Sequence, residues 1–410
     1  MPDTTYSKIQ GFMPFPNRVH LGESPSLYLT NTIKTFAESL IGIFVPIYIL
    51  MLKNLPIIVQ NHFTNGLIWV LAFYFIRSFA VILTIGFETN LIFGKINFKG
   101  SILGSNIILA LSLLLMSFMD LSFAYFIPAA IASGIAAITY WLPFHIFFVR
   151  KTSSTGHYGK NFGTRFLLDK LASAAGPILG GLFITLFGFN SLFTVGVVLI
   201  LVSAFPIMIG IHEHKHGKHN AHHIFKNFFH NHKYRNDTIA LISVAADGIL
   251  YGIFWPILLF TVIFTYAKLG LITSISVGLS AFAALSVGKL IDKRGTKTIH
   301  KIGVTINALL YLPRVFVINP IALYAIDITD KMNGTLFAVP FNALFYKHAK
   351  DHHNASDFVI YREIIVHSTV CFVMLISMLL IAVLSDWRYI FILIAIISPF
   401  SYFINIKNKK

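Results

Sequence analysis

Charged residues are scarce in this sequence, and their scarcity excludes most soluble proteins. Asp, Glu, Lys and Arg make up only 12% of the 410 residues, whereas a soluble domain carries roughly 25%. Hydrophobic residues make up 56%, and 40 residues are phenylalanine. A surface in contact with water needs more charge than this, so the composition predicts a membrane protein.

Cysteine and acidic residues are also few. Cys371 is the one cysteine, which excludes an internal disulfide. The 16 acidic residues are outnumbered by 32 basic ones, and the net charge is +16. A nucleic-acid partner would need that charge gathered on one folded, water-exposed face, and the sequence leaves no soluble domain to carry it. We therefore expect no nucleic-acid partner.

Long runs without charge indicate membrane-spanning helices, each of which needs about 20 apolar residues. The run Leu171–Ile211 is long enough for two helices, and the turn residues Gly188 and Asn190 lie at its centre. We predict an all-α integral membrane protein with twelve transmembrane helices. The predicted spans are residues 29–52, 64–87, 100–118, 121–148, 165–187, 191–210, 238–263, 270–291, 301–318, 320–346, 362–384 and 388–406.

The distribution of Lys and Arg predicts the orientation of the chain, because cytoplasmic loops are enriched in these residues. With both termini cytoplasmic, the outer loops hold only Lys53, Lys268 and Arg388. We expect a multi-pass protein of the cell membrane (plasma or inner), with no cleaved signal peptide. The predicted parts are a cytoplasmic tail (1–28), a six-helix bundle (29–210), a cytoplasmic linker (211–237), a second six-helix bundle (238–406) and a short cytoplasmic tail (407–410).

Two short segments recur in the two halves. GIFVPI (Gly42–Ile47) returns 210 residues later as GIFWPI (Gly252–Ile257), and LPFHIFF (Leu142–Phe148) returns as VPFNALF (Val339–Phe345). The copies appear in the same order at similar offsets, which indicates duplication of a six-helix unit. Two pseudo-symmetric bundles of this kind hold a binding site between them, near the middle of the bilayer.

The segment GKLIDKRGTK (Gly288–Lys297) resembles the loop motif of the major facilitator superfamily. The matching residues are Gly288, Asp292, Lys293, Gly295 and Lys297. The resemblance implies a conformational latch, in which Asp292 faces the positive N-terminus of a neighbouring helix. We expect that helix to be the fifth span, with Asp292 near Arg165. The first-half copy, GKINFKG (Gly94–Gly100), has no acid, so a latch there would be weaker or built differently.

A second segment, GPILGG (Gly176–Gly181), resembles the core of the Gly-Pro motif of proton-coupled antiporters in this superfamily. Ala172 stands where the motif has its first glycine, so the match is partial. Small residues and Pro177 also permit close helix packing and a kink. Export and simple packing are therefore both open interpretations.

Ionisable residues inside spans are costly and usually functional, and the resemblance implies that helices 1, 4, 7 and 10 line the cavity. Glu38 and Asp247 stand four and five residues before the repeated hexapeptide, so we expect a proton-binding pair of acids. The candidate cavity residues are Glu38, Asp247, Asp327, Asp330, Lys331, Arg77, Tyr140 and Tyr251. The alternative is that these groups, with Lys34, form internal salt bridges. Arg314, Asp169 and Glu363 are expected at the membrane interface.

The linker is rich in histidine between His212 and His232. Closely spaced imidazoles bind zinc, nickel or copper, which makes His212, His214, His216 and His219 weak candidate metal ligands. No cysteine is present and Glu213 is the one carboxylate, so the pattern fits no structural zinc site. We expect a solvated linker.

These features together predict a secondary active transporter that moves a small solute by alternating access, coupled to protons, with export as the direction that the Gly-Pro motif favours. The alternatives are a divalent-metal exporter using the histidine loop, and a non-transporting membrane sensor or assembly protein of the same fold. No nucleotide-binding signature or hydrolytic triad is present, so we expect neither an enzyme nor a cofactor. The expected working unit is a monomer whose partners are the lipid bilayer, the solute and protons.

Overall fold

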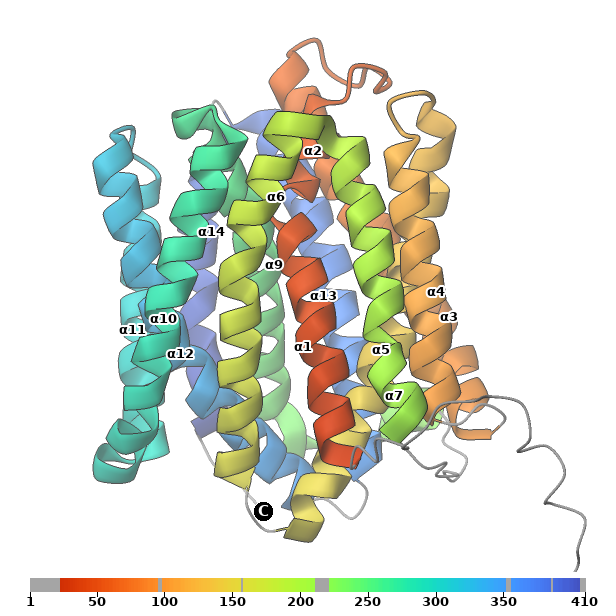
Figure 1. Ribbon diagram of the computed structural model, residues 1–410. Helices are drawn as coiled ribbons and strands as arrows, with labels where there is room; N and C mark the ends of the chain where they lie inside the picture. Colours follow the sequence, from red (N-terminus) through yellow and green to blue (C-terminus); the bar gives the residue numbers. More distant parts are fainter. Residues whose placement is uncertain are drawn as a thin grey trace, which may run out of the picture.

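A computed structural model describes residues 23–94, 98–155, 158–210, 221–351, 355–384 and 386–405. In these residues the chain is almost entirely helical and forms one bundle of long helices (Figure 1). The described chain begins and ends at the same end of the bundle, which is lower in Figure 1. We call this the lower end and the opposite one the upper end.

The first half of the bundle is built from seven helices. They are α1 (Glu23–Gly42), α2 (Val45–Met51), α3 (His62–Gly94), α4 (Phe98–Ser117), α5 (Phe126–Thr155), α6 (Tyr158–Ser203) and α7 (Phe205–Gly210). The helix α1 begins at Glu23, before the predicted start of the first span at residue 29. The break between α1 and α2 falls within the repeated hexapeptide, where Pro46 lies in the first turn of α2. Proline suits that position because its missing N–H would have no partner there.

The second half contains α8 (Ala221–Phe229), α9 (Arg235–Ile263), α10 (Tyr266–Arg294), α11 (Thr296–Arg314), α12 (Pro320–Asp351), α13 (Ala355–Val383) and α14 (Ile390–Ile397). Short 3₁₀ segments precede and follow α14, namely η3 (Trp387–Tyr389) and η4 (Ser398–Asn405). The second copy of the hexapeptide lies inside α9, which stays continuous around Pro256. The two copies therefore have different backbones, although their sequences differ by one residue.

The helix α6 reverses direction at Gly188. This glycine has φ +78° and ψ 176°, and the two arms of α6 meet there at the upper end (Figure 1). A positive φ is freely available only to glycine, which has no Cβ. The predicted fold-back at Gly188–Asn190 is therefore confirmed.

Nine segments of the described chain are long and apolar enough to cross a membrane, and one of them, Leu167–Ile209, contains the reversal in α6. The helices α11 and α12 are not among the nine, although they are 19 and 32 residues long. Their charged residues, which include Arg314, Asp327 and Asp330, lower their hydropathy. The all-helical membrane fold is confirmed, while the count of twelve spans remains a prediction.

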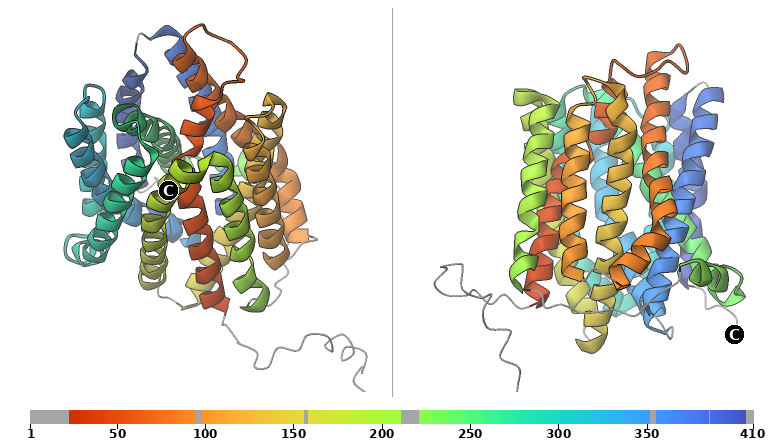
Figure 2. Two further views of the ribbon diagram at one scale, coloured as in Figure 1. Left: turned by 45° about the horizontal axis from the view of Figure 1, so that its top comes forward. Right: turned by 90° about the vertical axis from the view of Figure 1, so that its right-hand side faces the viewer.

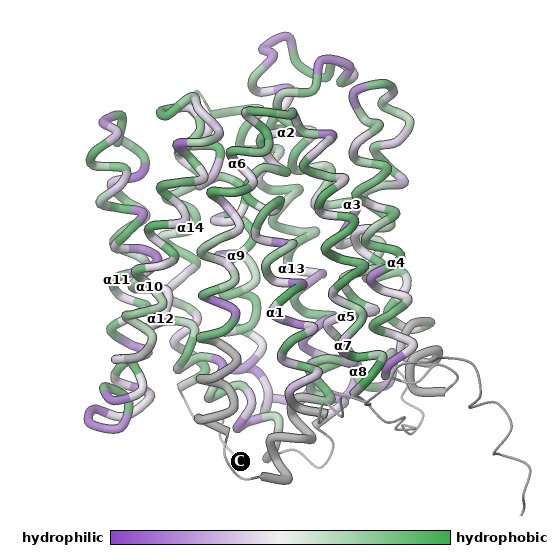
Figure 3. Tube along the Cα trace, in the orientation of Figure 1, coloured by the Kyte–Doolittle hydropathy of each residue, from purple (hydrophilic) through white to green (hydrophobic). Residues whose placement is uncertain are grey.

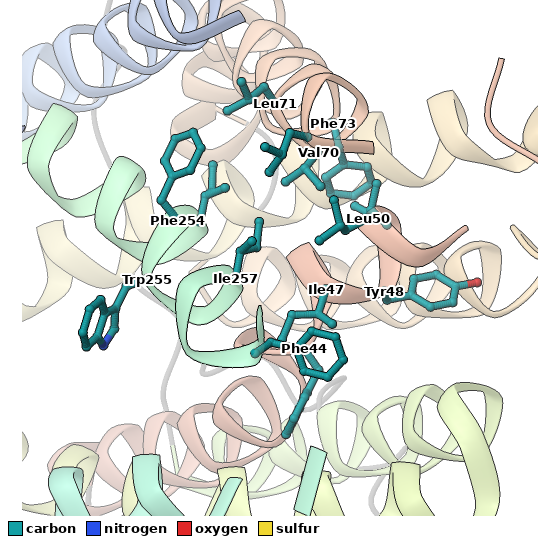
Figure 4. Close-up of a cluster of buried hydrophobic side chains, with 14 of the residues drawn as sticks. Phe44, Ile47, Tyr48, Leu50, Val70, Leu71, Phe73, Phe254, Trp255 and Ile257 are labelled. Atoms are coloured by element: carbon teal, nitrogen blue, oxygen red, sulfur yellow. The ribbon is translucent and has the colours of Figure 1, made fainter. Parts of the chain in front are cut away.

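The two halves lie side by side (Figure 2) and are in contact near both ends. At the lower end, one buried apolar cluster joins Val81 and Ile138 of the first half to Phe345 and Phe358 of the second. Nearer the upper end a larger cluster joins α2 to α9, and Figure 4 shows Ile257 of α9 beside Ile47 of α2. Hydrophobic residues predominate along the helices, with hydrophilic ones toward their ends and at some positions inside (Figure 3).

Candidate functional site

A first cavity, of about 230 Å³, lies among α1, α3, α4 and α5 in the first half. Two charged residues line it, Glu38 of α1 and Arg77 of α3. Around them are the rings of Phe73, Tyr74 and Trp141 and two serine hydroxyls. The structure therefore brings the predicted residues Glu38 and Arg77 into one cavity. Within the described residues no ion pair joins them.

Glu38 is paired with Lys34, one turn earlier on α1. Lys34 Nζ lies 3.4 Å from Glu38 Oε1, and the two side chains are 3% and 41% exposed. The buried ammonium group also donates to Asn106 Oδ1 at 3.4 Å and lies 4.3 Å from the centroid of the Tyr140 ring. Tyr140 donates to Asn31 at 3.2 Å and does not line the first cavity. Glu38 therefore connects the cavity to a buried cation.

A second cavity, of about 300 Å³, lies between the halves and carries three predicted residues, Tyr251, Asp327 and Lys331. Lys331 Nζ donates to the Tyr251 hydroxyl at 2.7 Å, and Asp327 Oδ1 accepts a 2.6 Å hydrogen bond from Trp255 Nε1. Small residues of α1 and α6, including Ser39, form the opposite wall. Trp255 was not anticipated, although it is the one residue that differs between the two hexapeptides.

A third cavity, of about 380 Å³, lies among α3, α9, α12 and α13. Arg77 lines this cavity as well as the first, together with Asn342, Arg362 and His367. Arg362 is paired with Glu363, and His367 Nε2 lies 3.8 Å from Glu363 Oε2. Sequence reasoning did not identify His367, because a single histidine in an apolar run carries no distinguishing signal.

Asp247 and Asp330, two further predicted acids, lie inside the second half and line none of these three cavities. Asp247 accepts from Asn307 at 3.2 Å, and Asn307 also donates to Ser398 at 2.8 Å. Asp330 accepts from Arg314 at 2.5 Å. The guanidinium of Arg314 lies 4.3 Å and 4.4 Å from the ring centroids of Tyr311 and Trp255.

Arg314 and Glu363, which were expected at the membrane interface, are buried inside the protein and are 0% and 4% exposed. Their depth in the membrane remains a prediction. Asp169 is half-buried and accepts from Asn31 at 2.6 Å. Each of these residues has a partner inside the bundle, which is why burial is tolerated. A signal was present in the sequence, since Arg314 interrupts a run of apolar residues.

The proposed latch residues lie at the α10–α11 turn at the lower end. Gly295, with φ +81°, separates the two helices, which explains the glycine of the motif. Asp292 is exposed, and none of the hydrogen bonds or ion pairs among the described residues involves it. The side chain of Arg165 lies outside the described part of the chain. The latch remains a prediction.

The glycines of GPILGG lie where helices approach most closely. A Cβ added at Gly176 would lie 1.9 Å from Ser39 Oγ of α1. A Cβ added at Gly180 would lie 2.1 Å from Leu40 O of the same helix. At Gly181 it would lie 2.3 Å from Tyr266 O of α10. The motif therefore has a packing role, as one of the two interpretations expected.

The candidate metal ligands His212, His214, His216 and His219 lie outside the described residues. The remaining His, Cys, Asp and Glu residues, so far as the structure describes them, include no group of three or more that could hold a metal ion. The predicted linker is partly helical, because α8 lies within it and packs on α13 through Phe228, whose ring is stacked on that of Tyr361.

Comparison with known proteins identifies the family. The sequence profile of the Major Facilitator Superfamily matches residues 27–364. The structure is similar to that of the nucleoside transporter NupG, with a TM-score of 0.65 and 12% identity over 95% of this chain and 100% of that one. A variant of NupG gives a TM-score of 0.67 with 12% identity, over 93% of this chain and 98% of that one. An auto-inhibited POT family peptide transporter gives 0.65 at 11% identity over 93% and 95%.

No curated protein matches the sequence. Identities of 11–12% establish the shared fold and no more. The family profile, by contrast, covers most of the chain and both of its halves. The protein therefore belongs to the Major Facilitator Superfamily and is a multi-pass membrane transporter.

Proposed function

We propose that this membrane solute transporter is a secondary active transporter, coupled to protons, which moves a small solute by alternating access. One chain supplies both halves, so a monomer is the proposed working unit. The lower end is proposed to be cytoplasmic, in the cell membrane (plasma or inner). Nothing in the family points to catalysis, and no cofactor is proposed.

The observation that carries this proposal is the position of the charges. Glu38, Arg77, Asp327 and Lys331 belong to helices of the bundle but line internal cavities. Charges within a membrane are costly and are retained where they serve a pathway. Apolar clusters join the halves near both ends, so a solute held between them would be shielded from both sides of the membrane.

Proton coupling is proposed to run through Glu38. Its carboxylate is exposed to the cavity while its partner Lys34 is buried. Protonation of Glu38 would leave that buried ammonium without its counter-charge, which is unfavourable in a region of low dielectric constant. A proton arriving from the cavity would therefore change the stability of this arrangement of α1. Asp327, which lines the second cavity, is the second proposed proton site.

The solute class is not carried over from the structural relatives. They transport nucleosides and peptides according to their descriptions, but they share only the fold with this chain. Their variety agrees with a common scaffold whose cavity residues select the solute.

The test is solute flux into proteoliposomes, measured for a panel of anionic, neutral and cationic solutes and for Zn²⁺, with and without a pH gradient. We expect one solute class to move, its rate to depend on the pH gradient, and a protonophore to abolish that dependence. The sign of the response gives the direction of transport. Gradient-independent flux would contradict coupling, and no flux at all would favour the sensor or assembly protein.

The histidine loop provides a separate arm of this test. A variant with its histidines replaced by serine should insert normally, because Lys226 and Arg235 keep positive charge in that region. We expect it to transport its solute at the wild-type rate. Zn²⁺ flux that is lost in this variant would instead establish a divalent-metal exporter.

A further inference from the structure

Arg77 occupies a position shared by two cavities. It lies within the membrane-spanning part of α3, His62–Phe87, and lines both the first cavity and the third cavity, which lies among α3, α9, α12 and α13. Its place is rigidly defined, because α5 packs closely against it. A Cβ added at Gly134 of α5 would lie 2.1 Å from the carbonyl oxygen of Arg77.

The guanidinium of Arg77, unlike those of Arg314 and Arg362, has no carboxylate partner among the described residues. Lys34 has Glu38, Arg314 has Asp330, and Arg362 has Glu363. Lys331 donates to the hydroxyl of Tyr251. Within the described residues, no carboxylate pairs with Arg77, and its Nε is buried without a hydrogen-bond partner.

The groups around Arg77 do not offset its charge. Lys34 is itself a cation, and His367, which lines the third cavity beside Arg77, is an imidazole and not a carboxylate. Glu38 shares the first cavity but is held by Lys34 at 3.4 Å. An uncompensated cation inside a membrane protein is unfavourable until a negative charge arrives. Arginine also presents a planar fork of donors that fits carboxylate and phosphate groups.

We infer that the transported solute is a small organic anion whose carboxylate or phosphate group binds Arg77. The rings of Phe73, Tyr74 and Trp141 line the first cavity and would contact the apolar part of the solute. The hydroxyl of Ser133 lines the same cavity and would donate a further hydrogen bond, whereas that of Ser112 already donates to Ala129 O at 2.9 Å. This inference rests on the proposed transport function, and it assigns a class of solute to the first cavity.

Binding is tested by thermal unfolding of the purified full-length protein. The probes are acetate, benzoate, succinate and inorganic phosphate, with acetamide and benzamide as neutral counterparts. The variants are Arg77→Gln, Arg77→Lys and, as a matched control, Arg388→Gln. Arg388 is a cation of the same type at the upper end, where it is paired with Asp386.

We expect at least one anion to raise the unfolding temperature of the wild type saturably, and its neutral counterpart to have no effect. Arg77→Gln should weaken that binding by about 10-fold or more, since it removes a charge-assisted contact. Arg77→Lys should retain part of it, and Arg388→Gln all of it. Without a probe, Arg77→Gln should unfold at a temperature no lower than that of the wild type, because no internal partner is abandoned.

Three results would overturn the inference: no probe stabilises the wild type, the stabilisation persists in Arg77→Gln, or that variant is markedly destabilised without a probe. Flux separates this inference from the proposed function. Transport of a neutral or cationic solute that is unaffected by Arg77→Gln would overturn the anion assignment while leaving the transporter in place. Anion binding through Arg77 without any flux would preserve Arg77 as an anion-binding residue and overturn the proposed transport cycle.

Discussion

Glu38 is the residue at which proton coupling is most directly testable. We expect Glu38→Gln to abolish flux driven by a pH gradient, because the amide copies the shape of the protonated acid but cannot release a proton. Glu38→Gln also removes the counter-charge of the buried Lys34, so we expect some loss of stability. Folding should survive, because Asn106 and the ring of Tyr140 still contact the ammonium group. The measurement is gradient-driven flux beside a thermal unfolding curve. Asp386→Asn, an acid outside the cavities, is the control, and full gradient-driven flux in Glu38→Gln would refute the assignment.

In the part of the chain that the structure describes, Arg314 and Asp330 form the most deeply buried ion pair with an arginine, and their role is proposed to be structural. Arg314 is 0% exposed and lies 2.5 Å from Asp330. Arg314→Gln should destabilise the protein by about 3 kcal/mol, because it leaves a buried carboxylate unpaired. The double variant with Asp330→Asn should recover most of that loss, giving a clear coupling energy in thermal unfolding.

The matched control is the pair Arg388–Asp386, which has the same chemistry at 2.5 Å but with both side chains 29% exposed. Its coupling energy should be about 0.5 kcal/mol. Additive effects of Arg314→Gln and Asp330→Asn would show that the buried pair does not act as a unit.

Asp247 shows how far residue positions can be inferred from a sequence repeat. Glu38 stands four residues before its hexapeptide and Asp247 stands five before the other copy. One residue corresponds to about 100° around a helix of 3.6 residues per turn. Glu38 therefore lines a cavity, while Asp247 contacts Asn307 inside the second half. The equivalence of the two helices remains a prediction, and the repeat could not predict the direction of each side chain.

Among contacts between helices, the close crossing of α6 and α10 depends on glycine. A Cβ at Gly270 would lie 2.1 Å from Pro177 O, whereas at Gly278 it would lie 4.0 Å from the nearest side chain, Ala174. The helices are therefore closest toward the upper end. Gly270→Ala should force them apart there and destabilise this arrangement by about 1–3 kcal/mol, the usual cost of overpacking.

Gly278→Ala, on the same helix, is the matched control and should be neutral or slightly stabilising, because alanine is the better helix former. Thermal unfolding compares the stabilities. Accessibility of a cysteine placed at the upper end should rise in Gly270→Ala only. Equal behaviour of the two variants would mean that the crossing tolerates a change in spacing.

Several elements could be predicted from the sequence because their cause is local. The reversal at Gly188 follows from a turn within a run too long for one helix, and the glycine of the loop motif is needed at the positive φ of Gly295. The helix α8 was missed because histidine and lysine in the linker resemble a solvated segment. Its apolar face, with Phe225 and Phe228, is stabilised by Tyr361, which is distant in sequence. Such a contact cannot be inferred before the fold is known.

At the scale of the whole molecule, the family can be predicted from short sequence segments, whereas the solute cannot. Repeated helices and one loop motif suffice to predict the superfamily, because they determine how two bundles pack. The solute depends on which charges remain unpaired after packing, and this is a property of distant contacts. Arg77 and Arg362 are both cations in apolar runs, yet Glu363 pairs with Arg362 and no described carboxylate pairs with Arg77.

Contacts between the halves at both ends lead to a prediction about the transport cycle. At the lower end, His145 lies 3.0 Å from the Tyr346 hydroxyl; at the upper end, the rings of Phe63 and Trp387 lie 5.9 Å apart. Alternating access requires each contact to separate in turn. In a Cys371→Ser background, a cysteine pair replacing either contact should be linked by a short bifunctional thiol reagent. Flux should fall about 10-fold or more once the pair is linked, because the bundles can no longer rock against each other.

The single-cysteine variants treated with the same reagent control for the modification itself, and they should keep their flux. A reagent with a cleavable bond allows the linked protein to be released, after which flux should return. Locking only one end should also leave the opposite end free to open, so that a third cysteine placed there stays accessible to a soluble thiol reagent. Undiminished flux in a protein linked at either end would mean that the solute crosses without separation of the two halves, and that the cavities act as a channel.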